Sequence, residues 1–380
     1  MKTFCGYFDE GKCHSCALIG TEYTEQLKLK ENSLTKHLEK FHDWKLLPSQ
    51  GSRPTQFRNK AKLVVTGTLE SPIIGLGGNE DLDQGREILN CSLHHPFINS
   101  VLHFMPEFIG LTRLTPYQIK EKKGELKGII IYFSEDSRES YLRLVLRSKE
   151  SLDRIKKHLP TLLENFPEIT CISANIQPIP HAILEGEEEV FLSERTFINH
   201  LVKDLTLRLG PQGFVQTNHK VARALYETAA TWTEELKIEK FSELFCGQGA
   251  FSFFVSEKVR SSIGFEINPE AVSEANRTAT SLGYDHLKFK CADAANVGEE
   301  LRKYAPDLVL VNPPRRGLAG AVEIFKEQGF EHIIYSSCSV ESLARDLIEL
   351  APFYKVIQAQ IFDMFPHTNH FETLVLLQKK

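Results

Sequence analysis

Cys338 is the residue whose sequence neighbours best suit a nucleophile. It ends His332-Ile-Ile-Tyr-Ser-Ser-Cys338, an apolar run stopped by small polar residues, which is typical of a buried strand that ends at a loop. Upstream, Asp307-Leu-Val-Leu-Val-Asn312 ends in the same way, before two prolines. In open α/β sheets, ligands bind at the carboxyl ends of the strands. Free cysteines are often buried and inert, so the prediction depends on the other motifs in this half of the chain.

A nucleoside-binding pattern precedes these two strands. Leu244-Phe-Cys-Gly-Gln-Gly-Ala-Phe251 has the form of a strand, a Gly-x-Gly turn and the start of a helix, where backbone N–H groups can approach a ligand closely. A tight structural turn would have the same form. The next predicted strand ends at Glu266, whose carboxylate can accept hydrogen bonds from ribose hydroxyls. A third ends in Cys291-Ala-Asp293, which offers a further carboxylate for an adenine pocket.

Two cofactors could occupy such a pocket. NAD sites usually have a third glycine in Gly-x-Gly-x-x-Gly, and this chain has Ser252 at that position. Together with the Asn-Pro-Pro turn at Asn312, this favours S-adenosylmethionine. The same turn is found in amino-methyltransferases, but those enzymes use no cysteine nucleophile, so Cys338 separates the two interpretations.

Cysteines are also concentrated near the N-terminus. Three of the eight lie between residues 5 and 16, which indicates a metal or cluster site rather than a disulfide framework in a cytosolic chain. Cys5, Cys13, Cys16 and Cys91 have the ligand count for an Fe–S cluster or for zinc. The other zinc set would be Cys13, Cys16, His37 and His42, with an unusually long gap.

The elements that must position these residues divide the chain into three predicted domains. Residues 1–54 form a small cysteine-containing segment with a helix over 33–43. Residues 55–200 form a strand-rich α+β module, with one helix over 151–166 and a surface loop over 72–88. Residues 201–380 begin with a helix over 220–235 and then alternate strands and helices before a final antiparallel hairpin. This order predicts an α/β doubly wound sheet.

Composition excludes some classes of protein. The 380 residues are 42% hydrophobic and 25% charged, and no apolar stretch is long enough to span a membrane. The N-terminus lacks the apolar core of a signal peptide, so we expect a cytoplasmic location. The net charge of -5 provides no global basic field, and any RNA contact must therefore come from local patches such as Arg315 and Arg316.

Five motifs together resemble the RNA (uracil-5-)-methyltransferase family. They are Phe214-Val-Gln-Thr-Asn218, Leu244-Phe-Cys-Gly-Gln-Gly249, Asn312-Pro-Pro-Arg-Arg-Gly317, Ile334-Tyr-Ser-Ser-Cys338 and His370-Phe-Glu-Thr373. The resemblance covers essentially the whole chain. Its further motifs resemble the branch that methylates bacterial 23S ribosomal RNA at a uridine of the uracil 747 type: Arg58-Asn-Lys-Ala-Lys62, Gly124-Glu-Leu-Lys127, Asn175-Ile-Gln-Pro178 and Phe362-Asp-Met-Phe-Pro-His367.

The resemblance implies a fold and a set of site residues. The fold is a class I S-adenosylmethionine-dependent methyltransferase domain, Rossmann-like with a seven-stranded sheet, beside a central RNA-binding module and an N-terminal Fe–S segment. Cys338 would be the nucleophile and Glu372 the general base. The implied cofactor contacts are Gln216, Phe245, Glu266 and Asn312, and the implied [4Fe-4S] ligands are Cys5, Cys13, Cys16 and Cys91. The implied partner is 23S ribosomal RNA, bound by a monomer.

The implied reaction explains these residue types. Carbon 5 of uracil is a poor nucleophile, and a thiolate that adds to carbon 6 turns the ring into an enolate that can attack a methyl group. The adduct keeps the proton on carbon 5, so a base must remove it before the thiolate leaves. A free thiol titrates near about 8.5, so Cys338 needs activation, and we expect it from a helix beginning near Val340.

Two departures from the family pattern remain, and two alternatives, of which the first is 5-methyluridine formation at another rRNA or tRNA uridine. Val215 stands where the family usually has Phe, and Gln248-Gly-Ala250 replaces its more common turn, but neither change removes a reactive group. The alternative from another class is a non-catalytic Fe–S RNA-binding protein that keeps the methyltransferase fold. The presence of both Cys338 and Glu372 argues against it.

Overall fold

The computed structural model describes residues 3–77, 83–179, 185–202 and 205–380. The chain divides into two compact units, each discontinuous in sequence. Unit 1 is Met1–Cys16 with Pro54–Gln212, and unit 2 is Ala17–Arg53 with Gly213–Lys380. No helix in the described part of the chain is long and apolar enough to cross a membrane. One division between the units falls between Arg53 and Pro54, and residues 17–53 belong to the unit that contains the doubly wound sheet.

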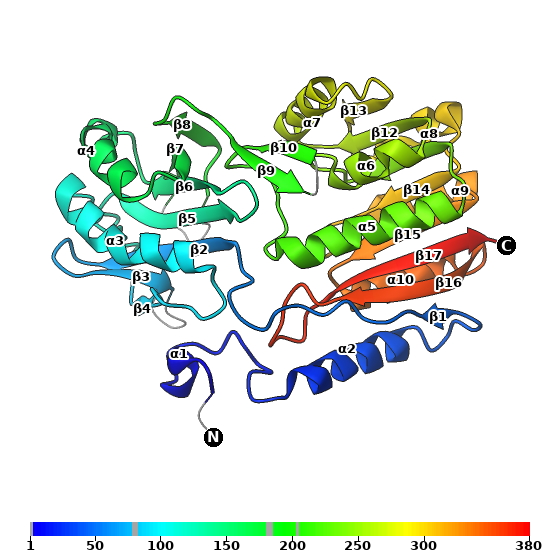
Figure 1. Cartoon of the computed structure of the whole chain (residues 1–380), viewed down its shortest axis with the longest axis horizontal. Coiled ribbons are helices and arrows are strands. Elements are labelled where there is room, and N and C mark those ends of the chain that lie inside the picture. Colours follow the sequence, from blue (N-terminus) through cyan, green and yellow to red (C-terminus); the bar gives the residue numbers. More distant parts are fainter. Residues whose placement is uncertain (1–2, 78–82, 180–184, 203–204) are drawn as a thin grey trace. The chain divides into compact units, whose positions relative to one another are not determined.

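Unit 2 is built on an eight-stranded sheet in the order β1-β16-β17-β15-β14-β11-β12-β13 (Figure 1). All strands are parallel except β17, which runs antiparallel to both β15 and β16. The strands are β1 (Lys45–Leu46), β11 (Lys240–Leu244), β12 (Ser261–Glu266), β13 (Leu287–Cys291), β14 (Leu308–Val311), β15 (His332–Ser337), β16 (Tyr354–Phe362) and β17 (Glu372–Lys379). Seven of them follow residue 239, and β1 from the N-terminal segment adds an eighth edge strand.

Helices cover both faces of this sheet, as the alternation of buried side chains requires. Leu308 and Leu310 pack with helices α5 and α6, whereas Val309 and Val311 pack with α2, α8, α9 and α10 on the other face. The sequence of a strand that is buried on both faces is a continuous apolar run. The helices are α2 (Tyr23–His37), α5 (His219–Glu235), α6 (Ala250–Val255), α7 (Pro269–Ser281), α8 (Gly298–Tyr304), α9 (Val322–Gln328) and α10 (Val340–Leu350), with 3-10 turns at Ser256–Lys258, Ala294–Asn296 and Ala319–Ala321.

Unit 1 contains a seven-stranded sheet in the order β4-β3-β2-β5-β6-β7-β8, in which only β6 and β7 are parallel, and a separate β9–β10 hairpin. Its strands are β2 (Lys60–Gly67), β3 (Pro72–Leu76), β4 (Arg86–Glu87), β5 (Leu126–Ser134), β6 (Glu139–Leu146), β7 (Ile169–Ile176), β8 (Glu188–Phe191), β9 (Ile198–Val202) and β10 (Leu205–Leu209). Its helices are α1 (Gly6–Asp9), α3 (Pro96–Thr112) and α4 (Leu152–Asn165). An α+β module with a mainly antiparallel sheet is therefore present.

Three local predictions were wrong in detail. The helix expected over 33–43 is α2, which begins at Tyr23 and ends at His37, because its buried face carries polar residues that hide the helical period. The expected loop over 72–88 contains strands β3 and β4, and its residues 78–82 lie outside the described residues. Helix α3, with Pro106 inside it, was not predicted.

Candidate active site

Strands β11, β12, β14 and β15 are parallel neighbours, so their carboxyl ends lie at one edge of the unit 2 sheet. The residue that ends each strand, or that directly follows it, therefore lies at this edge. Glu266 ends β12, Asn312 follows β14 and Cys338 follows β15. The edge thus collects residues that lie far apart in the sequence.

Strand pairing brings Cys338 next to Glu372. The antiparallel ladder between β15 and β17 ends at the pair Ser337 and Thr373. Continued by one residue, the same register would place Cys338 opposite Glu372, the first residue of β17. A charge interaction between the two groups agrees with this proximity. The nucleophile and base implied by the resemblance are therefore neighbours in space.

The Cys338 thiol is half-buried. Burial raises its pKa above the ordinary value, and the nearby Glu372 carboxyl adds to that rise, whereas the Arg315 guanidinium opposes it. Helix α10 begins at Val340, as expected, with Ser339 as its N-cap. The contribution that we expect from this helix is therefore smaller than the opposing effects of burial and Glu372, which favour the thiol form of Cys338.

Glu372 is buried, with 3% of its surface exposed. Burial raises the pKa of its carboxyl to about 8, although a hydrogen bond with Gln216 and the charge of Arg315 act in the opposite direction. Its Oε2 atom is buried and has no hydrogen-bond partner among the residues that the structure describes. A carboxyl poised near neutral pH with one free oxygen is suited to accept a proton from a ligand.

Arg315 is a functional residue that the sequence-based reasoning missed. It is exposed and appeared only as part of a basic patch. In the structure its guanidinium lies close enough to Cys338 to lower the pKa of that thiol, mainly through its charge. It also lowers the pKa of the Glu372 carboxyl. The available signal was its place three residues after Asn312, at the same sheet edge as Cys338.

Two neighbouring residues of helix α10 hold the loop that carries Arg315. Asp346, which is buried, accepts hydrogen bonds from the backbone N–H of Leu318 (2.7 Å) and from the Tyr335 hydroxyl (2.8 Å). Arg345 donates to the carbonyl of Arg316. Asp346 thus connects the loop after β14 to β15 itself, the strand that ends before Cys338.

The Gly-x-Gly turn between β11 and α6 has the conformation of a ligand-binding loop. Phe245, Gly247 and Gly249 all have positive φ angles, of 60°, 54° and 82°. A Cβ on Gly249 would lie 2.5 Å from the Phe289 ring, so no larger residue fits there. Phe245 is not a glycine, and its conformation stores strain of a kind that often marks functional loops.

Glu266 stabilises this turn through hydrogen bonds to its carboxylate. Its Oε2 accepts a hydrogen bond from the N–H of Gly247 and its Oε1 accepts one from the N–H of Asn268, both at 3.0 Å. The side chain is half-exposed at the sheet edge. Both oxygens keep lone pairs that could accept a ribose hydroxyl.

Ser252 has its own partner, which explains why the third glycine of the NAD pattern is missing. Its backbone N–H and hydroxyl both donate to Oε2 of Glu243, at 2.9 and 2.5 Å. Burial raises the pKa of the Glu243 carboxyl to about 8. This contact joins the end of β11 to helix α6. Ser252 therefore stabilises the turn through its hydroxyl group, which a glycine lacks.

The remaining predicted cofactor contacts occupy different positions. Gln216 is buried, and its side chain is near enough to Glu372 to lower the pKa of that carboxyl. Asn312 is half-buried, and its N–H donates to the carbonyl of Leu244 at 3.4 Å. Phe245 packs against the core cluster on one face of the sheet. All three lie in unit 2.

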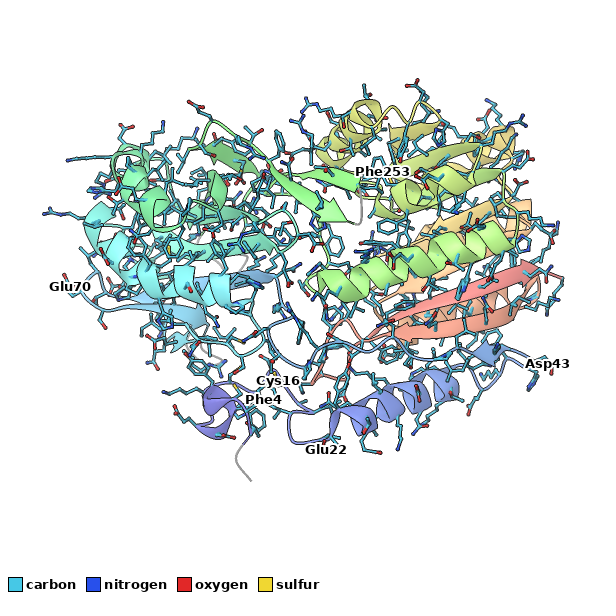
Figure 2. The ribbon with its side chains drawn as sticks, in the orientation of Figure 1. Phe4, Cys16, Glu22, Asp43, Glu70 and Phe253 are labelled. Carbon is cyan, nitrogen blue, oxygen red and sulfur yellow. The ribbon has the colours of Figure 1, made fainter. Side chains whose placement is uncertain are left out.

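The four N-terminal cysteines line one cavity of about 140 Å³ in unit 1. Burial raises the pKa of Cys16 to about 12, and the nearby thiols of Cys91, Cys13 and Cys5 raise it further. Cys16 and Phe4, which also lines the cavity, both belong to the N-terminal segment and are labelled in Figure 2. Neither histidine of the other zinc set, His37 and His42, lines it.

The thiols do not converge on a single point. Among the described residues, no group of three or more His, Cys, Asp or Glu side chains is arranged to hold one metal ion. A [4Fe-4S] cluster needs a different arrangement, because each thiolate binds a separate iron. Four thiols around a cavity fit such a cluster better than they fit a single zinc ion.

Known proteins are similar to this chain over nearly its full length. The model of the family described as tRNA (Uracil-5-)-methyltransferase matches residues 188–380. The 23S rRNA (uracil(747)-C(5))-methyltransferase of Proteus mirabilis is 39% identical over 98% of each chain, and that of Vibrio cholerae is 39% identical over 99% of this chain and 100% of its own. The solved tRNA (uracil-54, C5)-methyltransferase of Pyrococcus abyssi, with S-adenosyl-L-homocysteine, has the same fold, with a TM-score of 0.79 and 24% identity over 96% of this chain and 85% of its own.

Proposed function

Because the chain belongs to the tRNA (Uracil-5-)-methyltransferase family, we propose that it methylates carbon 5 of a uridine in 23S ribosomal RNA, at the position that its relatives' names give as uracil 747. The observation that carries this proposal is the β15–β17 register, which makes a thiol and a buried carboxyl neighbours. The enzyme is a methyltransferase that uses S-adenosylmethionine. A substrate in the ribosome would place it in the cytoplasm.

Cys338 and Arg315 act first. The Cys338 thiolate forms a bond to carbon 6 of the uracil ring, and the electron pair of the 5,6 double bond moves into an enolate. Arg315 stabilises the thiolate, since its charge already lowers the pKa of the thiol. S-adenosylmethionine, when bound, would supply the electrophilic methyl group that carbon 5 accepts, and its methyl–sulfur bond would break to leave S-adenosylhomocysteine.

Glu372 completes the reaction. Its free Oε2 removes the proton from carbon 5, and the resulting electron pair restores the double bond as the bond from carbon 6 to Cys338 breaks. Since the pKa of Glu372 is about 8, the carboxylate is a stronger base than an exposed glutamate. The low polarity that raises this pKa also prevents water from competing for the carboxylate.

The cofactor would lie along the edge formed by β11, β12 and β14. We assign the ribose contact to Glu266, the methionine and adenine side to Phe245 and the 245–249 turn, and further contacts to Gln216 and Asn312. Two observations support this assignment. All four residues lie in one unit, and the turn at Gly247 has the positive φ angles that let a backbone approach a ligand closely.

The N-terminal thiols would hold a [4Fe-4S] cluster. Cys5, Cys13, Cys16 and Cys91 supply four thiolates around one cavity, which is the donor set that such clusters require. Methyl transfer needs no electron, so the cluster would tie the first sixteen residues to the rest of unit 1. Protein purified without air should then be brown, with about four irons per chain. Stoichiometric zinc without visible absorbance would contradict this assignment.

Tritium release tests the main proposal. Purified protein, S-adenosylmethionine and 23S rRNA that carries tritium on carbon 5 of its uridines should release tritium into water, because the base removes that hydrogen in each turnover. Modified-base mapping of the product should show 5-methyluridine at one site. Transfer RNA labelled in the same way is the control. Tritium release from transfer RNA alone would contradict the proposal that 23S rRNA is the substrate. No tritium release from any RNA would favour a non-catalytic RNA-binding protein.

A further inference from the structure

Residues 17–53, which we call the N-terminal strap, fold with the methyltransferase sheet although about 160 residues separate them from it in the chain. Helix α2 of the strap packs against α10, and β1 pairs with β16. Figure 2 labels Glu22, the N-cap of α2, and Asp43, beyond its end. The face that α2 buries is largely polar, and Gln26 and Lys30 are only 1% and 2% exposed. Buried polar side chains are costly unless they make specific hydrogen bonds.

One set of these bonds holds Asp363, at the start of the loop between β16 and β17. Lys30 donates from Nζ to Oδ1 of Asp363 at 2.6 Å, and the two side chains are 1% and 0% exposed. The Tyr23 hydroxyl donates to Oδ2 at 2.8 Å. Burial and the charge of Asp363 raise the pKa of Tyr23, so the phenol keeps its proton. Both oxygens of Asp363 are thus held by the strap.

A second set holds His367 in the same loop. Its backbone N–H donates to Oε1 of Gln26 at 2.8 Å, and Nε2 of Gln26 contacts its Nδ1 at 3.1 Å. Its carbonyl accepts a hydrogen bond from the N–H of Leu18 at 2.9 Å. His367 has a φ of 65°, a conformation that residues other than glycine adopt where surrounding contacts stabilise it. Five residues later the chain reaches Glu372.

The chain of bonds continues to a second part of the site. The hydroxyl of Tyr23 accepts a hydrogen bond from the N–H of Ser52 at 2.7 Å, and Oγ of Ser52 accepts one from Nδ2 of Asn218 at 2.8 Å. Asn218 is 2% exposed and precedes α5. It lies two residues after Gln216, whose buried side chain is near enough to Glu372 to lower the pKa of its carboxyl.

We propose that the N-terminal strap is a positioning element of the active site, with Tyr23 as the residue that couples the Gln216 segment to the loop leading to Glu372. Tyr23 reaches both because its one hydroxyl donates in one direction and accepts from the other. The strap touches neither RNA nor cofactor in this proposal. It acts through Glu372, and its catalytic part therefore rests on the function proposed above.

Tyr23→Phe removes this hydroxyl with little change of volume. The matched control is Tyr354→Phe, which removes a buried tyrosine hydroxyl that donates to the carbonyl of Phe325 in the same unit, at the opposite end of β16. Hydrogen exchange of the full chain, read by mass spectrometry, should become about tenfold faster in residues 214–218 and 363–371 together in Tyr23→Phe. A tenfold change corresponds to about 1.4 kcal/mol. The control should leave both segments unchanged.

Activity provides the second measurement. If Glu372 is displaced, proton removal slows more than methyl transfer, so Tyr23→Phe should accumulate the covalent RNA adduct while Tyr354→Phe should not. Ser52→Ala, a small change at the other link, should speed exchange in 214–218 alone. Equal exchange in Tyr23→Phe and its control would overturn the proposal, as would faster exchange spread over all of unit 2. A wild-type protein that fails to methylate would reject the proposed function, while the exchange measurement still tests the strap.

Discussion

Replacing Arg315 by Met should raise the pKa of Cys338. The guanidinium lowers the pKa of the thiol and of the neighbouring Glu372 carboxyl, so removing it should raise both. Arg315 is exposed, and solvent weakens its charge interactions to about 1 kcal/mol or less. One pKa unit corresponds to about 1.4 kcal/mol. The pKa of Cys338 should therefore rise further above its ordinary value in Arg315→Met.

The rate of alkylation by iodoacetamide reports this shift without RNA or cofactor, because only the thiolate reacts. The rate at Cys338, measured against pH by peptide mass spectrometry, should follow a titration that lies above the ordinary range in the wild type. Cys291, the exposed cysteine of the same unit, serves as an internal reference. Since Glu372 ionises in the same range, the curve describes the coupled pair.

Two further variants separate charge from loop structure. Arg315→Lys keeps the charge and should restore most of the wild-type profile. Arg316→Met removes the same charge from the next residue of the same exposed loop, and Arg316 is not among the main influences on the pKa of Cys338. It should leave the pH profile of Cys338 alkylation unchanged. An unchanged profile in Arg315→Met, or equal shifts in both Met variants, would refute the role of Arg315.

The remaining predictions concern the other site residues. Cys338→Ala should abolish the covalent adduct and methylation, whereas Glu372→Gln should allow addition and methyl transfer but trap the adduct, as gel mobility of the protein–RNA complex would show. Single-turnover elimination should speed up as the pH rises through about 8, because Glu372 must lose its proton to act as a base. Between pH 4.5 and about 8, the folded protein keeps the proton on Glu372 and the unfolded chain has lost it. Glu372 therefore makes stability fall as the pH rises from about 4.5 to about 8, and Glu372→Gln should flatten the denaturation profile in that range. Glu266→Ala should weaken cofactor binding by roughly 1.5–3 kcal/mol for each lost hydrogen bond, and it should also loosen the Gly247 turn. Unchanged affinity by calorimetry would place the ribose contact elsewhere. If the four thiols hold the proposed cluster, Cys91→Ser should bleach anaerobic protein without reducing adduct formation by more than a few-fold, since the proposed mechanism assigns the cluster no chemical step.

Local patterns predicted most elements of the catalytic half. Apolar runs that end in small polar residues marked β14 and β15, and the glycines marked the turn at Gly247, because strand burial and positive φ angles depend on residues close in sequence. Helix α2 shows the limit of this approach. Its buried face contains the polar residues Gln26 and Lys30, which bind His367 and Asp363 more than 330 residues away, so no local period of apolar residues revealed it.

The sequence alone therefore determined which chemical groups are present and at which strand ends they stand: a thiol after β15, a carboxylate at the end of β12 and a carboxyl at the start of the last strand. Tertiary structure decided which of them meet. The register of β15 against β17 makes Cys338 and Glu372 neighbours, and the loop held by Asp346 brings Arg315 to them. Burial then raises the pKa of Glu372 to about 8, because desolvation depends on everything packed around a group and not on the residues beside it in the chain.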